Sequence, residues 1–270
     1  MSLPALMVDA HAHIFTLDMP LIDNPRHSPT YSFTLNDYLA QLDSNHVDYG
    51  VIAAARPWGD YNDYTRACVK MTPRLRGTVI LHPEKLDQYP LDAMTQEGIL
   101  GIRLPFIGLN KLPDIRSPEY RRLFGALADH GWHVHLHVEG RHIPDLLPHL
   151  ENAGPRLVID HLGRPEPDAV KDAPAFRPIA DAVNRGKAWV KASCGYRIGA
   201  IAGEHLSAYL QECGPDSLFW ASDCPFVGHE GELEFADTIR WLDALVTDEE
   251  ARSKIFGANA LAFYFPELAR

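Results

Sequence analysis

The sequence predicts an α/β fold, namely a single-domain (β/α)8 TIM barrel over residues 1–270, and three observations support this prediction. The chain length of 270 residues suits one barrel, which typically needs about 250 residues. Short apolar, β-branched runs alternate with stretches of helical periodicity along the chain. Several of these runs end in polar side chains, and barrel enzymes place their active sites at the carboxyl ends of the strands.

Eight runs are expected to form the strands. Each run is continuously apolar, which is typical of parallel strands that are covered on both faces. The runs are residues 6–10, 49–55, 77–81, 99–105, 132–138, 157–161, 188–193 and 218–222. An open doubly wound sheet would show a similar periodicity, but the polar residues at the ends of the runs favour the closed barrel.

Three predicted helices have recognisable boundaries. Ser117 before Pro118 combines an N-cap with a first-turn proline, and Gly131 follows the apolar stripe of the same helix. Two capping boxes mark further helix starts, formed by Thr34 with Asp37 and by Thr247 with Glu250. Between the first two strands, residues 16–33 are rich in Pro, Asn, Asp and Ser. They are too many for a minimal loop, and a lid over the site and a plain surface excursion are both open.

The composition is that of an ordinary globular protein, with 46% hydrophobic and 23% charged residues. The formal net charge of −11 argues against nucleic acid or an anionic membrane as a partner, because binding to phosphates needs a basic surface. A small anionic substrate would have to be bound by a local group of cations. The sequence leaves open whether copies of the chain form a homo-oligomer.

The cysteines and the amino terminus indicate the compartment. The four cysteines form no C-x-x-C pair and are too sparse for a disulfide framework. The first residues lack the basic start and apolar core of a signal peptide, and no apolar run approaches the ~20 residues of a membrane span. We therefore expect a cytoplasmic protein with no membrane segment.

Two histidines end the first run and are candidates for the active site. Residues two apart on a strand share a face and lie roughly 6.6 Å apart, so His11 and His13 can converge on one point. With His137 and Asp223 they would make a ligand set for one divalent metal, most readily zinc, which keeps a position open for water. The alternative is that no metal is required and the histidines donate hydrogen bonds to a developing oxyanion.

Three arginines near the ends of runs suggest an anionic substrate. Arg103, Arg164 and Arg197 carry the forked donors that bind carboxylates in bidentate fashion. Arg103 is the strongest candidate, because an arginine within an apolar strand must have a partner there. Pairing with acidic side chains of the protein is the alternative for each of them.

The end of the last run offers a general base. Asp223 lies between an apolar strand and the turn-forming Cys224-Pro225, where it could take a proton from an attacking water. Lys191 is expected to form an ion pair rather than to polarise a carbonyl. Cys194 and Cys224 have no thiolate-activating motif and are not expected to be nucleophiles. Trp58, Trp132 and Trp189 are expected to be packing residues.

At these residues the sequence resembles the amidohydrolase superfamily, in particular the branch of 2-pyrone-4,6-dicarboxylate lactonases and sugar-lactone hydrolases and isomerases. The resemblance spans nearly the whole chain, and the ordered set of motifs is far more specific than a lone H-x-H. The motifs are VDAHAHIF at 8–15, GIR at 101–103, VIDHLGRP at 158–165, WVKAS at 189–193, WASDCP at 220–225 and IFGANA at 255–260.

The resemblance implies a hydrolase that opens a carboxylated lactone ring, similar to 2-pyrone-4,6-dicarboxylate or an aldarolactone. It implies that Asp223 activates water and that His161 positions or polarises the scissile carbonyl, with His11 and His13 beside them. Substrate contacts would come from Arg103, Arg164, Arg197, His137 and Ser193. The chain departs from the branch at His137, where the pyrone lactonase looks to carry a tyrosine, and this leaves both the substrate and the metal open.

Two other functions fit the same residues. A metal-dependent decarboxylase or a lactone isomerase of the same superfamily would share the first-strand histidines and the final aspartate. A non-catalytic barrel that binds a small acid is also compatible with the fold, because fold does not determine chemistry.

Overall fold

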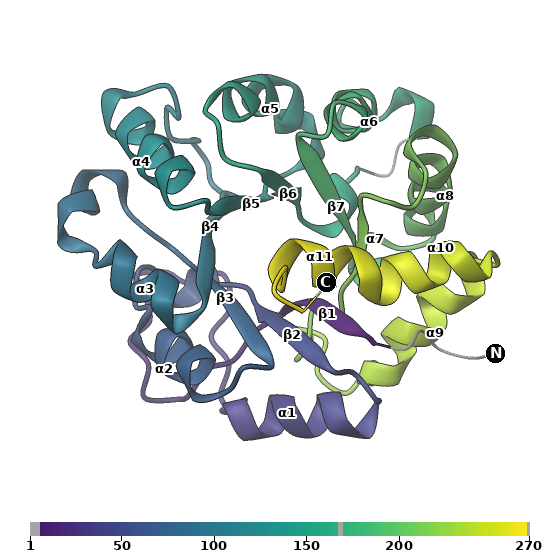
Figure 1. Ribbon diagram of the computed structural model, residues 1–270, viewed down its shortest axis with the longest axis horizontal. Helices are drawn as coiled ribbons and strands as arrows, with labels where there is room; N and C mark the ends of the chain where they lie inside the picture. Colours follow the sequence, from purple (N-terminus) through teal and green to yellow (C-terminus); the bar gives the residue numbers. More distant parts are fainter. Residues whose placement is uncertain (1–5, 167–169, 269–270) are drawn as a thin grey trace.

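The computed structural model describes residues 6–166 and 170–268. Eight parallel strands pair in the order β1-β2-β3-β4-β5-β6-β7-β8, and Figure 1 shows them at the centre of the molecule with the helices around them. The strands are β1 (Val8–Ala12), β2 (Tyr49–Ile52), β3 (Leu75–Val79), β4 (Ile99–Pro105), β5 (His133–His137), β6 (Leu157–Ile159), β7 (Ala188–Ala192) and β8 (Leu218–Trp220). The predicted (β/α)8 TIM barrel is thus confirmed.

The connections between the strands contain the helices that cover the barrel. They are α1 (Leu35–Ser44), α2 (Asp63–Met71), α3 (Leu91–Glu97), α4 (Pro118–Asp129), α5 (Ile143–Asn152), α6 (Phe176–Asn184), α7 (Gly195–Ile198), α8 (Ile201–Cys213) and α9 (Phe235–Leu245). After them come α10 (Glu249–Ser253), a π-helical turn at Lys254–Ala258 and α11 (Asn259–Tyr264).

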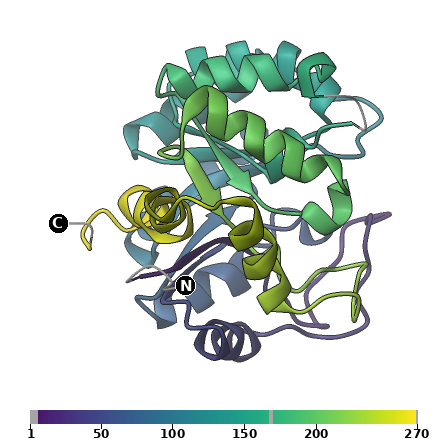
Figure 2. The same cartoon turned by 90° about the vertical axis from the view of Figure 1, so that its right-hand side faces the viewer.

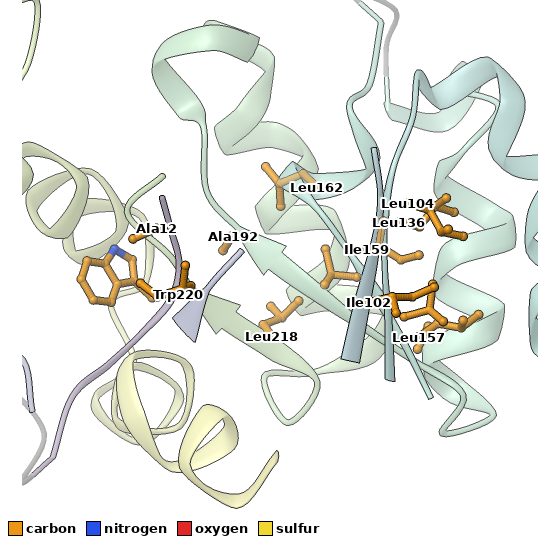
Figure 3. Packing of buried hydrophobic residues seen from close by; sticks show 14 of the residues in the cluster. Ala12, Ile102, Leu104, Leu136, Leu157, Ile159, Leu162, Ala192, Leu218 and Trp220 are labelled. Atoms are coloured by element: carbon orange, nitrogen blue, oxygen red, sulfur yellow. The ribbon is translucent and has the colours of Figure 1, made fainter. Parts of the chain in front are cut away.

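The strands bury both of their faces, as their continuous apolar runs predict. One layer of buried side chains lies between strands and helices; Figure 3 shows Ile102, Leu136 and Trp220 in it. The other layer fills the barrel itself, where Val8, Val51 and Phe219 meet residues of α11. The final helix therefore plugs one end of the barrel, and chemistry is confined to the other end.

The predicted boundaries hold to within a few residues, although the third run, placed at residues 77–81, begins and ends two residues earlier, as β3 at Leu75–Val79. The fourth run was placed at residues 99–105, which is the observed β4, whereas β1 begins two residues later than predicted, at Val8. Thr34 and Ser117 cap α1 and α4 as expected. The predicted capping box at Thr247 is wrong, because Asp248 is the N-cap of α10 and accepts from the backbone N of Ala251. Both threonine and aspartate are common N-cap residues, and the sequence offers them at adjacent positions.

The seam between β1 and the chain after β8 closes the barrel. The backbone N of Asp223 donates to His11 O at 2.9 Å, and that of His13 donates to Cys224 O at 2.8 Å. The buried Asp9 carboxylate accepts from Ser222 N at 2.8 Å, from Ser222 Oγ at 2.6 Å and from Tyr38 Oη at 3.0 Å. Burial raises the pKa of Asp9 to about 6 against the effect of these bonds. One carboxylate on β1 thus fixes the residue that precedes Asp223.

The long loops lie at the end of the barrel opposite α11, and Figure 2 shows the two ends on opposite sides of the molecule. Residues 16–33 follow β1, and the backbone of Phe15 pairs with that of Phe33. The loop after β8 meets this segment, because Tyr31 Oη donates to Glu230 Oε1 at 3.2 Å. None of the helices in the described part of the chain is long and apolar enough to cross a membrane.

Candidate active site

A pocket of about 760 Å³ opens at the carboxyl ends of the strands. Its walls contain Asp223, four histidines and five arginines, together with apolar side chains such as Trp58. The histidines are His13, His27, His137 and His161, and the arginines are Arg26, Arg56, Arg103, Arg164 and Arg197. Most of the residues singled out in the sequence therefore converge on one cavity.

Asp223 is the acidic group in the described walls of this pocket. Its Oδ1 lies 3.5 Å from His13 Nε2 and 3.8 Å from His161 Nε2. Its Oδ2 accepts from Tyr196 Oη at 2.6 Å, from Cys194 Sγ at 2.9 Å and from Arg197 Nε at 3.2 Å. Burial opposes its ionisation, but the neighbouring imidazoles outweigh burial and hold the pKa of Asp223 well below its ordinary value. The group is therefore an ionised carboxylate with Oδ1 directed at the histidines.

Four residues at or near the site have a positive backbone φ, which residues other than glycine rarely adopt. Asp223 has φ 64°, His161 φ 54°, Arg164 φ 46° and Cys194 φ 62°. Left-handed non-glycine residues of this kind cost on the order of 1 kcal/mol each and cluster at functional sites. All four residues lie in the turns that follow β6, β7 and β8. The left-handed backbone bends each turn, so that side chains after three different strands come close together.

The two first-strand histidines occupy different positions. His13 lies on the pocket wall and its Nδ1 contacts Ala53 O at 2.7 Å. His11 is completely buried behind it, with its Nε2 3.3 Å from His13 Nε2 and 3.6 Å from Asp223 Oδ1. The structure thus places His13 on the pocket wall and His11 behind it, in contact with His13 and Asp223.

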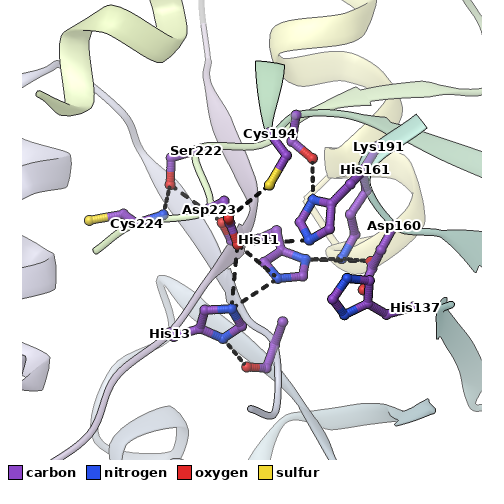
Figure 4. Close-up of polar contacts among 12 residues, drawn as sticks. His11, His13, His137, Asp160, His161, Lys191, Cys194, Ser222, Asp223 and Cys224 are labelled. Atoms are coloured by element: carbon purple, nitrogen blue, oxygen red, sulfur yellow. Dashed lines mark hydrogen bonds and ion pairs between the residues drawn. The ribbon is translucent and has the colours of Figure 1, made fainter. Parts of the chain in front are cut away.

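A cluster of buried charged side chains contacts His11 on the side away from the pocket. Lys191 Nζ lies 2.8 Å from His11 Nδ1 and 3.0 Å from Asp160 Oδ1, and Arg103 Nε donates to Asp160 Oδ2 at 2.8 Å. Figure 4 shows His11 between Lys191 and Asp223. Lys191 thus forms the expected ion pair. Burial lowers its pKa to about 8, so the amine carries its proton at neutral pH.

Arg103 has less freedom to bind substrate than the sequence suggested. Besides Asp160, its Nη1 donates to Ala54 O at 2.9 Å and its Nη2 contacts His137 Nδ1 at 2.9 Å. The guanidinium is 4% exposed, so it reaches the pocket only at one edge. Ser193 was expected at the substrate; it is buried behind His161, whose Nδ1 lies 2.8 Å from Ser193 Oγ.

Three donor atoms have the spacing of a small metal site. The distances among His11 Nε2, His13 Nε2 and Asp223 Oδ1 are 3.3, 3.5 and 3.6 Å, and the edges of a tetrahedral zinc site with bonds near 2.0–2.1 Å are about 3.3–3.4 Å. Their spacing therefore fits one divalent metal. His137, the fourth ligand in the sequence prediction, belongs to none of the clusters of potential ligands found among the described residues, because it turns toward Arg103.

The arginines divide into engaged and free groups. Arg197 donates to Asp223 and, through Nη2, to Val227 O at 2.7 Å, while Arg56 Nη1 donates to Ile107 O. Within residues 6–166 and 170–268, the guanidinium groups of Arg26 and Arg164 have no hydrogen-bond or ion-pair partner. Burial, followed by the charges of Arg164 and Arg197, lowers the pKa of Arg26. Two unneutralised cations therefore face the same cavity.

Several pocket residues were missed in the sequence. Arg26 and His27 lie in residues 16–33, and Arg56 comes shortly after β2. Tyr196, the second residue of α7, does not line the pocket but donates to Asp223. Arg26, His27 and Tyr196 do not end an apolar run, so the criterion that found the other residues could not find them. Arg56 directly follows the predicted run 49–55, so the same criterion indicated it and it was overlooked. The length of the 16–33 segment was the available signal, and the segment does form part of the pocket wall.

Known proteins resemble this chain over nearly its whole length. The chain is 23% identical, over 98% of its length and 92% of the other chain, to the 2-pyrone-4,6-dicarboxylate hydrolase of Comamonas testosteroni. A solved structure from Pseudomonas putida, assigned as a 2-pyrone-4,6-dicarboxylic acid hydrolase, is 32% identical with a TM-score of 0.86, covering 98% of this chain and 100% of that one. One from Acinetobacter baumannii with the same assignment and with citric acid bound is 26% identical with a TM-score of 0.89, covering 96% and 98%. The amidohydrolase family model matches residues 8–265, and the chain therefore belongs to the amidohydrolase family.

Proposed function

We propose that the protein is a hydrolase that opens the ring of a small carboxylated lactone, with water activated by Asp223. The observation that carries this proposal is one ionised carboxylate in a pocket lined by five arginines, two of them without partners among the described residues. Such a pocket attracts a dianion or trianion locally although the chain has a net charge of −11. The relatives' assigned substrate, a pyrone dicarboxylate, is an anion of this class.

The reaction follows from the positions of the groups. Asp223 takes a proton from water as the hydroxyl oxygen adds to the lactone carbonyl, and His161 and His137 lie on the walls around it. Collapse of the tetrahedral intermediate breaks the ring C–O bond and leaves a new carboxylate and a hydroxyl or enol oxygen that takes up a proton. Arg164, Arg197 and Arg26 hold the carboxylates that the substrate already carries. Burial lowers the pKa of His161 to about 3, so this imidazole is neutral and acts through hydrogen bonds.

A divalent metal, if one is bound, would be held by His11, His13 and Asp223 and would lower the pKa of its water. The described cysteines are all free thiols, which suits the reducing cytoplasm in which we place the protein.

The test is a panel of pyrone dicarboxylates and aldarolactones, with ring opening followed by ultraviolet absorbance and acid release. We expect turnover of at least one dianionic lactone. Asp223→Asn should lower kcat by about 10²- to 10⁴-fold while binding of a non-reacting dicarboxylate is retained, and Asp216→Asn serves as a surface control. Turnover of no member would refute the proposal, carbon dioxide release would indicate a decarboxylase, and a rearranged lactone product would indicate an isomerase.

A further inference from the structure

Two buried cations each contact one imidazole near the active site, and in both cases the contact is to the Nδ1 atom of the ring. Lys191 Nζ lies 2.8 Å from His11 Nδ1, and Arg103 Nη2 lies 2.9 Å from His137 Nδ1. Neither ring can be an imidazolium, because an imidazolium has a hydrogen on both nitrogens and would direct one of them at the cation. A neutral imidazole has one N–H and one lone pair, so each ring must choose which nitrogen carries the hydrogen.

The cations decide this choice by their chemistry. A lysine ammonium and an arginine guanidinium have donors and no acceptor. At 2.8 and 2.9 Å, an N–H on either Nδ1 would set two donors head to head. The Nδ1 atoms must therefore accept, and the hydrogen lies on Nε2. We infer that Lys191 and Arg103 are positioning residues that hold His11 and His137 as Nε2–H tautomers, so that both rings present a hydrogen-bond donor at the active site.

One neighbouring group favours the opposite tautomer of His11. Asp160 Oδ1 lies 3.4 Å from His11 Nδ1 and would accept a hydrogen from it. The Lys191 contact is 0.6 Å shorter (3.4 against 2.8 Å). Lys191 also lies 3.0 Å from His135 Nδ1 and 3.0 Å from Asp160 Oδ1. The contact with Asp160 is an ion pair without hydrogen-bond geometry, so the ammonium donates to the two imidazoles.

The next contacts along the chain of hydrogen bonds agree with this direction. His13 Nδ1 faces Ala53 O at 2.7 Å, and a carbonyl can only accept, so His13 carries its hydrogen on Nδ1. Its Nε2 lone pair then faces His11 Nε2 at 3.3 Å and can accept from an Nε2–H on His11. Asp223 Oδ1 is the other acceptor at this point, 3.6 Å from His11 Nε2 and 3.5 Å from His13 Nε2, and it attracts the same hydrogen of His11. Hydrogen bonds thus run in one direction from Lys191 through His11 and His13 to Ala53.

His137 differs from His11 because its Nε2 is free for a ligand. Within the described ranges no protein group bonds this nitrogen, and the residue lies on the pocket wall. Its N–H can donate to the scissile carbonyl and to the oxyanion that forms there. This last role rests on the proposed function, whereas the two tautomers do not.

The same hydrogens affect metal binding. A metal between His11, His13 and Asp223 needs a lone pair on His11 Nε2, where we place an N–H group. Binding must expel this hydrogen while Lys191 continues to occupy Nδ1. We therefore expect Lys191 to weaken metal binding, and its removal to strengthen it.

The direct test is the long-range ¹H–¹⁵N spectrum of the ¹⁵N-histidine-labelled full chain at neutral pH, which reports the protonated nitrogen of each ring. Signals of His11 and His137 are assigned by their loss in His11→Gln and His137→Gln. We expect the Nε2–H pattern for both rings in the unsubstituted protein. An Nδ1–H pattern for either ring overturns the inference, and no substituted protein needs to be active for this result.

Substitution tests the role of the cations. In Lys191→Met, where Asp160 keeps its ion pair with Arg103 and Asp160 Oδ1 stays near His11 Nδ1, His11 should show a mixture of tautomers or Nδ1–H. Cobalt(II), titrated by its visible spectrum, should bind at least tenfold more tightly than to the unsubstituted protein. Lys85→Met, with an exposed lysine paired to Asp60, is the matched control and should change neither result. An unchanged His11 spectrum in Lys191→Met refutes the role of Lys191.

The role of the free N–H is tested separately. His137→Gln keeps a donor and His137→Phe removes it, so kcat should fall at least tenfold more in the phenylalanine variant while KM changes less. Equal kcat values refute the donor role but leave the tautomers standing. Absence of lactone turnover in the unsubstituted protein would instead count against the proposed function.

Discussion

The neighbours of Asp223 lower its pKa by more than burial raises it. Its pKa lies well below the ordinary value, and that of His161 is lowered to about 3. A general base acts in its ionised form, which exists at every pH above its pKa and disappears only as the pH falls through that pKa. Neither group therefore changes charge near neutrality.

For a lactone whose carboxylates are ionised, we predict that kcat/KM is constant between about pH 5 and about pH 7. A histidine acting as the base would instead produce a rise with a midpoint near 6.5. The measurement is kcat/KM across this range at fixed ionic strength, with circular dichroism at each pH to show that the fold is intact. A midpoint between pH 6 and 7 would remove Asp223 as the base.

At the scale of elements, the segment 16–33 contributes charge to a pocket that is otherwise built from strand ends. It carries Arg26 and His27 to the pocket. It is fixed by the Phe15–Phe33 pairing, by the stacking of Phe15 on Trp58 with ring centroids 4.7 Å apart, and by Tyr31. These contacts anchor the segment while leaving the Arg26 guanidinium free for an anion.

Arg26→Gln should therefore raise KM for a dianionic lactone by roughly tenfold to a hundredfold, since a hydrogen bond to a charged group contributes about 1.5–3 kcal/mol. The value of kcat should change little, because Arg26 lies away from Asp223. Steady-state kinetics with a dianionic and a monoanionic lactone measure the effect, and the loss should be smaller for the monoanion. Arg122→Gln, at an exposed arginine paired with Asp87, is the control; an equal loss for both substrates would argue against a carboxylate contact.

The π-helical turn before α11 packs against the start of β1 so closely that only glycine fits. A Cβ on Gly257 would lie 1.9 Å from Leu6 O, whereas one on Gly125 in α4 would meet nothing within 4 Å. Gly257→Ala should cost about 2–3 kcal/mol and lower Tm by several degrees. Gly125→Ala should gain about 0.5–1 kcal/mol. Calorimetric Tm values of both variants check this pair, and equal shifts would contradict the packing at Leu6.

At the scale of the whole molecule, the barrel is closed by a seam in which Asp9 has four hydrogen-bond donors, from His11, Tyr38 and Ser222. Asp9→Asn places an amide donor among them, and each unsatisfied buried group costs about 1–3 kcal/mol. We predict a loss of about 2–4 kcal/mol in the free energy of unfolding, measured by urea denaturation. Asp43→Asn, which breaks an exposed pair with Arg74, should cost less than about 1 kcal/mol, and comparable losses would argue against the seam.

The fold could be predicted because each strand is a continuous apolar run in the sequence, and several of these runs end in polar residues. Asp223, His13, His161 and Arg164 were found for that reason. Arg26 and Tyr196 could not be found, because loop and short-helix residues have no periodicity that shows where they point. The buried partners of Arg103 and Lys191 were also beyond reach, since a side chain in a strand does not reveal which of several neighbours across the barrel it contacts.

The seam has a consequence for how the protein is made. Asp9 and Ser222 are 213 positions apart, so the first strand leaves the ribosome long before the residues that satisfy its carboxylate. Until then Asp9 must stay hydrated, and Asp223, the neighbour of Ser222, has not been synthesised. Contacts this distant in sequence slow folding. The pocket therefore forms only near the end of synthesis, because a chain that stops before Ser222 lacks both the partner of Asp9 and the carboxylate of Asp223.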